Sequence, residues 1–185
     1  MREVEIRSFI TEDDYQRLLE RMKKEGEDGG KEKQVTIYFS GENDLRIQKS
    51  EESAKIWMKD GEIHEKAREE IEITIHKNEF EAVRRLFEAL GHEVDIKWYR
   101  KRHRFHWDGL KVCIDHTPGY GRIVEVEKLT DEDGQEEALE EVKRALEKLG
   151  VEETPREKFD QRYRNYRKKW QDILRKKDLS EFDDI

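Results

Sequence analysis

The sequence predicts an α+β fold, in which an eight-stranded antiparallel β-barrel carries helices on its outside and a helical extension at its C-terminus. Two patterns lead to this prediction. Charged and apolar residues alternate in short stretches along the chain, which is typical of strands whose two faces differ in surroundings. Longer segments place apolar residues at helical spacing, and these need the apolar strand faces as partners. With the helices outside a closed sheet, the charged strand faces would point inward.

The first half is predicted to contain a strand, a helix, two hairpins and a second helix. Thr11 is a helix N-cap followed by acidic residues, and Gly91 is a C-terminal stop. Turn signals occur at residues 41–44 and at Asp60-Gly61. The predicted elements are a strand at 2–9, a helix up to residue 24, a polar loop at 26–33, strands at 34–39, 45–48, 54–59 and 63–76, and a helix at 78–90.

The second half is predicted to repeat this pattern of strands, turns and helices. Asp108-Gly109 and residues 118–121 are turn signals, Gly150 ends one helix, and Pro155 begins another. The predicted elements are strands at 93–106, 110–116 and 123–128, helices at 132–149 and 156–175, and a frayed tail over the last ten residues. We therefore expect one domain over residues 1–150 and a helical extension of that domain over 151–185.

The composition limits the class of protein. The 185 residues suit one domain with an appendage, and charged residues make up 45% of the chain. A net charge of -8 with both signs mixed argues against a nucleic-acid polymer or a membrane as a partner. The single cysteine, Cys113, lies in a predicted strand and is expected to be a buried, inert thiol. Without a membrane-spanning run or a signal-peptide pattern, we expect a cytoplasmic protein.

The charged positions of the predicted strands suggest the site. An unpaired buried charge costs several kcal/mol, so an inward-facing charged lining makes sense as a wet tunnel for a highly charged ligand with cations. An open sheet with a solvated charged face is the alternative, but it predicts no sorting of charge sign by strand. The positions are Glu3, Glu5, Arg7, Arg46, Gln48, Arg68, Glu70, Glu72, Arg100, Arg102, Arg104, Asp115, Glu125 and Glu127.

Acidic and basic members of this set suit different parts of one ligand. Carboxylate oxygens are the ligands that Mg²⁺ and Mn²⁺ prefer. Residues two apart on a strand lie about 6.6 Å apart, so an ion would draw ligands from two strands, and the strands at 2–9 and 123–128 are the best pair. Guanidinium and ammonium groups bind phosphate oxygens. The combination is typical of a site for a polyphosphate with its divalent ion.

Several motifs resemble the CYTH superfamily, the triphosphate tunnel metalloenzymes, which include class IV adenylyl cyclases and thiamine triphosphatases. The resemblance covers about residues 1–150. The motifs are Glu3-Val4-Glu5-Ile6-Arg7, Leu45-Arg46-Ile47-Gln48, Trp57-Met58-Lys59, Arg68-Glu69-Glu70-Ile71-Glu72, Arg100-Lys101-Arg102 and the segment from Asp115 to Glu127.

The resemblance implies a role for each group of residues around a triphosphate and Mg²⁺ or Mn²⁺. The implied metal ligands are Glu3, Glu5, Asp115, Glu125 and Glu127. The implied phosphate ligands are Arg7, Arg46, Lys59, Arg68, Arg100 and Arg102. The implied catalytic residues are Glu3, Glu5, Arg7 and Lys59, and the tunnel-lining residues are Gln48, Glu70, Glu72 and Arg104.

The chain departs from the family pattern at three positions. Arg7 replaces a commoner lysine, Gln48 stands where an arginine is usual, and Thr36 stands where an aspartate often occurs. The helix at 156–175 would either plug the tunnel or pack on it, and we expect packing. His103, His106 and His116, and Trp57, Trp98 and Trp107, are expected to be structural rather than acid–base or ring-stacking groups.

Three functions fit these residues. The first is divalent-metal-dependent hydrolysis of a triphosphate, either inorganic tripolyphosphate, thiamine triphosphate or a nucleoside triphosphate. The second is a class IV adenylyl cyclase that forms cyclic AMP and pyrophosphate. The third is a non-catalytic module that binds polyphosphate or nucleotide. All three take a small-molecule triphosphate, and we expect a monomer or homodimer.

Overall fold

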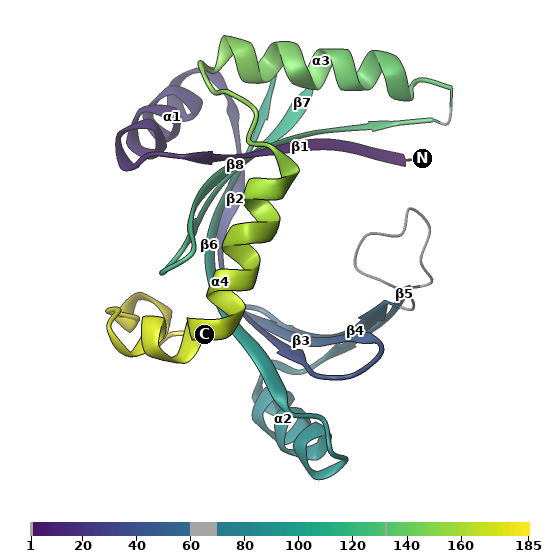
Figure 1. The fold of residues 1–185 in the computed structure, drawn as a ribbon. Coiled ribbons are helices and arrows are strands. Elements are labelled where there is room, and N and C mark those ends of the chain that lie inside the picture. Colours follow the sequence, from purple (N-terminus) through teal and green to yellow (C-terminus); the bar gives the residue numbers. More distant parts are fainter. Residues whose placement is uncertain (1, 60–69, 132) are drawn as a thin grey trace. The chain divides into compact units, whose positions relative to one another are not determined.

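A computed structural model describes residues 2–59, 70–131 and 133–185. Figure 1 shows the strands and helices. Two short 3₁₀ helices lie at Lys77–Glu79 and Ser180–Phe182. The strands are β1 (Arg2–Ile10), β2 (Glu27–Phe39), β3 (Asp44–Ser50), β4 (Ala54–Lys59), β5 (Glu70–Ile75), β6 (Val94–Trp107), β7 (Leu110–Thr117) and β8 (Gly121–Thr130). The helices are α1 (Glu12–Glu25), α2 (Phe80–Ala89), α3 (Gln135–Lys148) and α4 (Arg156–Arg175).

The eight strands have the order β1-β8-β7-β6-β2-β3-β4-β5. The ladders of β1 with β8, β8 with β7, and β7 with β6 are antiparallel, as are those that join β2 to β5 in sequence. This confirms the predicted eight-stranded antiparallel α+β fold with four helices. The strand order ends at β1 and β5, so the sheet of the described residues is not closed into the predicted barrel, although it is consistent with a tunnel fold. Within the described ranges, no helix is long and apolar enough to cross a bilayer.

The predicted loop at residues 26–33 is wrong, because β2 already begins at Glu27. Its first residues, Asp28-Gly29-Gly30, are turn-forming types and therefore concealed the strand. A Cβ on Gly29 would lie 3.1 Å from Cβ of Arg104, so a glycine allows the two backbones to approach closely here. The strand predicted at 63–76 is described only from Glu70 onward.

The chain forms two compact units, each with its own apolar core. Unit 1 comprises residues 1–31 and 101–164. In this unit α1 and α3 bury their apolar stripes on β1, β7 and β8. Leu18 and Met22 of α1 and Val142 of α3 have no solvent exposure, and neither do Val124 and Val126 of β8. Arg17 and Arg21 of α1 donate to the carbonyls of Leu149 and Lys148 at the end of α3, which satisfies carbonyls that the helix leaves unpaired.

Unit 2 comprises residues 32–100 and 165–185. Its core lies between α2 and strands β2, β3 and β4. The fully or nearly fully buried members are Val35, Ile37, Phe39, Ile47, Ala54 and Phe80.

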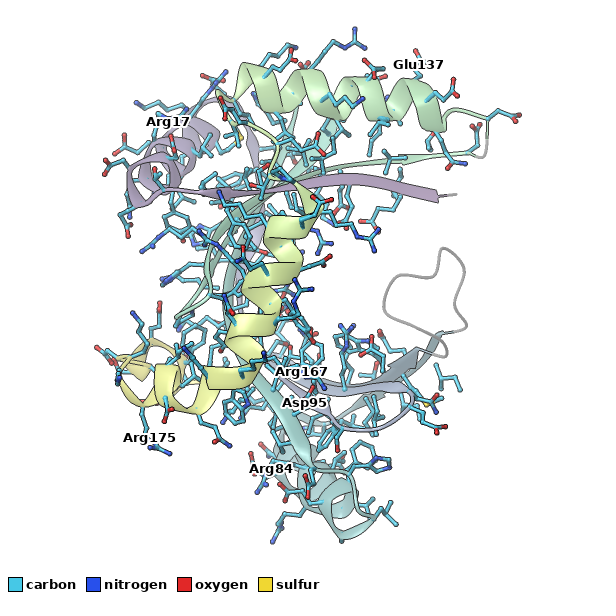
Figure 2. All side chains as sticks on the ribbon, in the orientation of Figure 1. Arg17, Arg84, Asp95, Glu137, Arg167 and Arg175 are labelled. Carbon is cyan, nitrogen blue, oxygen red and sulfur yellow. The ribbon has the colours of Figure 1, made fainter. Side chains whose placement is uncertain are left out.

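The C-terminal residues of unit 2 are packed, which corrects the prediction of a frayed tail. Phe182 is buried and meets Tyr99 edge-on at 5.2 Å, and Lys33 pairs with Asp184 at 2.6 Å. In α4 the indole of Trp170 donates to the carbonyl of Asp95, whose carboxylate binds Arg167 (Figure 2). The apolar residues of the tail are few and widely spaced, so the sequence pattern did not reveal this packing.

Both units bear out the predicted division of strand faces. In β1, Ile6 enters the core while Glu5 and Arg7 lie on the opposite face, and in β3, Ile47 enters the core while Arg46 and Gln48 lie opposite. The helices of each unit therefore cover an apolar face and leave a charged face on the other side of the strands.

His103 of β6 gives a test of the unit 1 core. It is buried, neither ring nitrogen has a hydrogen-bond partner among the described residues, and burial followed by the charges of Lys31 and Lys101 lowers its pKa below the ordinary 6.5. The unfolded chain therefore gains this proton first as the pH falls, so the folded state loses stability below pH 6.5. His103→Phe should flatten that loss between about pH 7 and pH 5, and raise the free energy of unfolding at neutral pH by about 1 kcal/mol.

Urea unfolding of both proteins across this pH range measures the effect. His106→Phe is the matched control, because His106 is an exposed residue of the same strand. Parallel pH profiles for wild type and His103→Phe would contradict a buried neutral imidazole.

Candidate functional site

The acidic residues of unit 1 meet because β1, β8 and β7 are adjacent and in register. Glu5 of β1 lies opposite Glu127 of β8, and Arg7 lies opposite Glu125. On the other side of β8, Glu125 lies opposite Cys113 of β7. The predicted pairing of the first strand with the strand at 123–128 is therefore confirmed.

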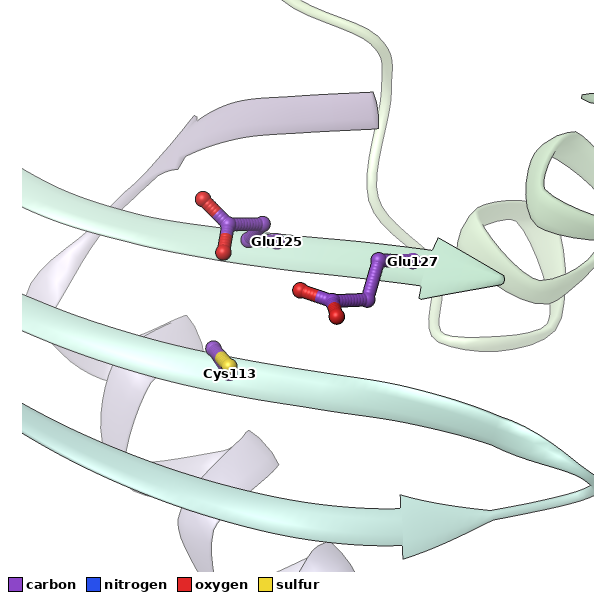
Figure 3. A group of neighbouring side chains, drawn as sticks. All are labelled: Cys113, Glu125 and Glu127. Carbon is purple, nitrogen blue, oxygen red and sulfur yellow. The ribbon is translucent and has the colours of Figure 1, made fainter. Parts of the chain in front are cut away.

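Three buried side chains on this charged face form a candidate metal group. Ligand atoms of Cys113, Glu125 and Glu127 all lie within 4.8 Å of one another. Figure 3 shows the two glutamates on one strand and Cys113 on the neighbouring strand. The three residues are 0%, 7% and 5% exposed. Two buried carboxylates are suitable ligands for a hard divalent ion, and Cys113 adds a soft donor atom.

Basic side chains neutralise this group only in part. Lys111 binds Glu127 at 2.5 Å. Arg102 holds Asp115 through two contacts, Nε to Oδ1 at 2.9 Å and Nη2 to Oδ2 at 2.7 Å, and reaches Glu125 at 3.1 Å. Burial lowers the pKa of Arg102, but the hydrogen bonds of Asp115 and the nearby negative charge outweigh it and raise the pKa. Arg102 therefore stays cationic between two acids.

The remaining acids favour a bound cation. Burial raises the pKa of Glu125, although the charge of Arg102 opposes it, and the charge of Glu5 adds to the rise. Burial and then a hydrogen bond with Glu127 raise the pKa of Glu3. Crowded carboxylates whose ionisation is opposed by burial and by one another are stabilised when a cation joins them. The donor set thus fits the divalent ion that the sequence motifs imply.

The structure places the five predicted metal ligands in different surroundings. Glu125 and Glu127 belong to the buried group and Glu3 adjoins Glu127. Glu5 is more exposed and pairs with Arg7 at 3.4 Å, whereas Asp115 is held by Arg102. The place of Cys113 in the metal group was not predicted from the sequence. Its position two residues before Asp115, on the same face of an alternating strand, was the signal.

The thiol of Cys113 is buried as expected. Burial raises its pKa to about 11, so the free thiol keeps its proton at neutral pH. Its position beside two carboxylates was not expected.

The predicted phosphate ligands of unit 1 differ in availability. Arg7 is 55% exposed on the charged face of β1. The guanidinium of Arg102 is 12% exposed and engaged by acids, so its visible role is to hold Asp115 and Glu125. Arg104 is partly buried at the close approach of Gly29.

In unit 2, Arg46 is held on the charged face by three neighbours. Its Nε donates to Asp44 at 2.6 Å, and its guanidinium carbon lies 4.3 Å from the ring centre of Tyr38 and 5.2 Å from that of Trp57. Planar contacts of this kind fix the orientation of a guanidinium. Asp44 and Tyr38 were absent from the predicted site.

Gln34, which was also missed, joins two predicted site residues of unit 2. Its Oε1 accepts from Nε of Arg100 at 2.8 Å and from Nε2 of Gln48 at 3.0 Å. Gln48 also donates to Thr36 at 3.2 Å. Two of the three departures from the family pattern, Gln48 and Thr36, are thus hydrogen-bonded to each other in one buried polar network.

The remaining predicted residues either make simple pairwise or core contacts or lie outside the described part of the chain. Glu72 pairs with Lys55 at 2.8 Å across β4 and β5. Arg68 and the side chains of Lys59 and Glu70 lie outside the described part of the chain. Trp107 is a core residue and Trp98 meets Tyr166 edge-on at 5.0 Å, as expected of structural aromatics. Trp57 lies on the charged face instead, beside Arg46.

The chain is similar to known proteins over most of its length. The profile of the CYTH domain matches residues 1–163. A protein of Methanocaldococcus jannaschii, whose name assigns it provisionally as an adenylate cyclase, is 32% identical over 165 residues, which cover 82% of this chain and 91% of that protein. A solved structure of a conserved hypothetical protein from Pyrococcus furiosus has a TM-score of 0.65 at 25% identity, with 82% of this chain and 92% of that chain covered.

A second solved structure is that of a Hippeastrum protein, described as a provisional adenylyl cyclase with a dominant triphosphatase activity. It has a TM-score of 0.59 at 18% identity, and the match covers 81% of this chain and 89% of that chain. At this identity the likeness concerns the fold. Because the CYTH domain profile matches most of the sequence, this chain belongs to the CYTH domain family.

Proposed function

We propose that this chain is a divalent-metal-dependent triphosphatase. The observation that carries the proposal is the juxtaposition on the charged face of unit 1. Buried Glu125 and Glu127 offer carboxylates to an ion, and exposed Arg7 lies directly across the β1–β8 ladder from Glu125. Acids for the cation and an exposed guanidinium for phosphate oxygens are the two components that a metal–triphosphate substrate needs.

In this proposal each side chain has a separate task. Glu125 and Glu127 hold the ion, with Glu3 and Glu5 beside them, and Arg102 and Lys111 keep those carboxylates in place. Arg7 binds and orients the phosphate chain. When bound, Mg²⁺ or Mn²⁺ would offset the charge of the transferring phosphoryl group. Arg46 and Arg100 of unit 2, whose orientations are fixed by Asp44 and Gln34, remain predicted phosphate ligands.

An adenylyl cyclase is the second candidate. The provisional name of the Methanocaldococcus jannaschii relative, which is 32% identical, favours it. A cyclase would use the same acids and Arg7, but the ribose 3′-hydroxyl would replace water as the nucleophile and pyrophosphate would leave. The two reactions therefore differ in their products rather than in the residues that hold the phosphates.

Product analysis distinguishes the candidates. The protein is incubated with tripolyphosphate, thiamine triphosphate or ATP, each with Mg²⁺ or Mn²⁺, and the products are separated by chromatography. We expect orthophosphate and the corresponding diphosphate, and no activity in EDTA. Cyclic AMP with pyrophosphate would establish the cyclase instead, and tight tripolyphosphate binding without turnover would indicate a binding module. Glu5→Gln should lower the metal-dependent rate by about 100-fold or more while the fold is retained.

The metal ligands can also be tested through stability. Because burial raises the pKa of Glu125, folding of the metal-free protein favours the protonated carboxyl, so stability falls as the pH rises from the ordinary 4.5 through the raised value. Glu125→Gln should remove this fall and leave the protein in EDTA at least as stable as wild type at neutral pH. Mn²⁺ should raise the melting temperature of wild type and have little effect on the variant.

Thermal unfolding by circular dichroism, in EDTA and in Mn²⁺, measures both effects. Glu152→Gln is the control, since Glu152 is an exposed acid of the same unit. Equal stabilisation of Glu125→Gln and wild type by Mn²⁺ would refute the metal assignment.

A further inference from the structure

A group of aromatic side chains follows Arg7 on the charged face of β1. We call Phe9, Tyr120 and Phe159 the aromatic cluster. The rings of Phe9 and Phe159 stack, with centroids 4.4 Å apart and planes inclined by 27°. Tyr120, in the turn between β7 and β8, meets Phe9 edge-on at 5.3 Å. All three rings are partly exposed, so the cluster lies outside the buried core of unit 1.

Two guanidinium groups border the aromatic cluster. The guanidinium carbon of Arg162 lies 4.2 Å from the ring centre of Phe9, and its Nη1 donates to the carbonyl of Tyr120 at 3.4 Å. The guanidinium carbon of Arg7 lies 5.9 Å from the ring centre of Phe159. The cluster is therefore continuous with the proposed phosphate ligand Arg7.

The backbone holds the aromatic cluster in place. The amide of Phe9 donates to the hydroxyl of Thr154 at 3.0 Å, and the amide of Thr154 donates to the hydroxyl of Ser8 at 2.9 Å. These reciprocal bonds fix the start of α4 beside β1. Gly121 completes the arrangement, because a Cβ there would lie 3.1 Å from Nη1 of Arg162 and 3.2 Å from the ring of Phe9. The side chains need the space that a glycine leaves.

The order of side chains along β1 matches the order of parts in one class of substrate. Glu5, Arg7 and Phe9 share a face and follow one another at intervals of roughly 6.6 Å. They offer an acid, then a phosphate ligand, then an aromatic surface. A nucleoside triphosphate with its cation presents the ion with its phosphates, then a sugar, then a planar base. Tripolyphosphate has no part that an aromatic surface would recognise.

The charges beside the cluster select among aromatic head groups. Arg7 and Arg162 are cations next to the rings. They disfavour the cationic thiazolium of thiamine triphosphate and accept a neutral base, which can stack on an aromatic ring or a guanidinium plane. Stacking of a base on an aromatic side chain contributes about 1–3 kcal/mol, which is enough to discriminate strongly between substrates with and without a base.

We propose that the aromatic cluster and Arg162 bind the base of a nucleoside triphosphate, so that the first half of α4 sets the specificity of this protein. The inference rests on the proposed function, because it places the phosphates beside Arg7 and the acidic group. If the cluster only anchors α4, its loss would weaken the binding of every triphosphate alike.

The test measures binding rather than turnover. Calorimetry with Mg²⁺ gives Kd for an imido analogue of tripolyphosphate and for a β,γ-imido analogue of ATP, in which P–N–P links replace the bonds that the proposed triphosphatase would break. In wild type we expect the ATP analogue to bind more tightly. Phe159→Leu, which keeps an apolar side chain but removes the ring, should change the ratio of the two Kd values by about tenfold, against the analogue. Phe159→Tyr keeps a ring and should hold the ratio within about twofold.

Arginine variants provide the matched control. Arg162→Ala should shift the ratio in the same direction as Phe159→Leu, whereas Arg164→Ala, at an exposed position of the same helix, should leave it unchanged. Thermal unfolding in EDTA checks that each variant is folded.

Three outcomes would overturn the inference. The first is an unchanged ratio in Phe159→Leu. The second is a wild type that binds the tripolyphosphate analogue as tightly as the ATP analogue. The third is a greater loss of binding for an imido analogue of thiamine triphosphate than for the ATP analogue in Phe159→Leu. Selective binding of the analogue in a protein that hydrolyses no triphosphate would support the aromatic cluster and refute the triphosphatase. Triphosphate hydrolysis together with an unchanged ratio of Kd values in Phe159→Leu would support the triphosphatase and refute the role of the aromatic cluster.

Discussion

The register of the ladder that joins β1, β8 and β7 is the constraint on which the rest of unit 1 depends. Ile6 lies opposite Val126, and Val126 opposite Val112, so one face of all three strands is apolar and is covered by α1 and α3. The same register places Glu5 beside Glu127, and Glu125 beside Cys113. A slip of one residue would exchange the two faces, exposing the core and burying the acids under helices. Core packing and site geometry are therefore specified by the same interaction.

The charged face of unit 1 buries ionisable groups at a cost in stability. Arg102 and Lys111 pair with Asp115, Glu125 and Glu127, yet burial still raises the pKa of Glu125. A core built only for stability would replace these groups with apolar side chains of similar volume, which is often neutral or favourable. Their retention beside the exposed guanidinium of Arg7 is understandable if a cation and an anionic ligand complete the charge balance.

Unit 2 shows how a site residue can be replaced without leaving an unsatisfied polar group. Gln48 and Thr36 both differ from the family pattern, and Gln34 binds both Gln48 and Arg100. A buried amide is tolerated when its donors and acceptors are used. The network therefore preserves the orientation of Arg100 although two positions that are usually charged in the family, 36 and 48, are neutral here. This coupling argues that the departures are accommodated structurally, which favours a working site over a degraded one.

From its pattern alone, the sequence determined the strand faces, the helices and the acidic pair on β8, because periods of two and of 3.6 residues are local properties of the chain. It did not reveal the start of β2, because the glycines there are typical of turns. Nor did it reveal the packing of the last residues around Phe182. The sequence motifs identified Glu125 and Glu127. Only the tertiary structure showed that Cys113 lies beside them, that Gln34 and Asp44 bind predicted site residues, and that Arg102 pairs with Asp115. Those relations depend on which strands are neighbours and in which register, and long-range pairing of this kind is not written in any short stretch of sequence.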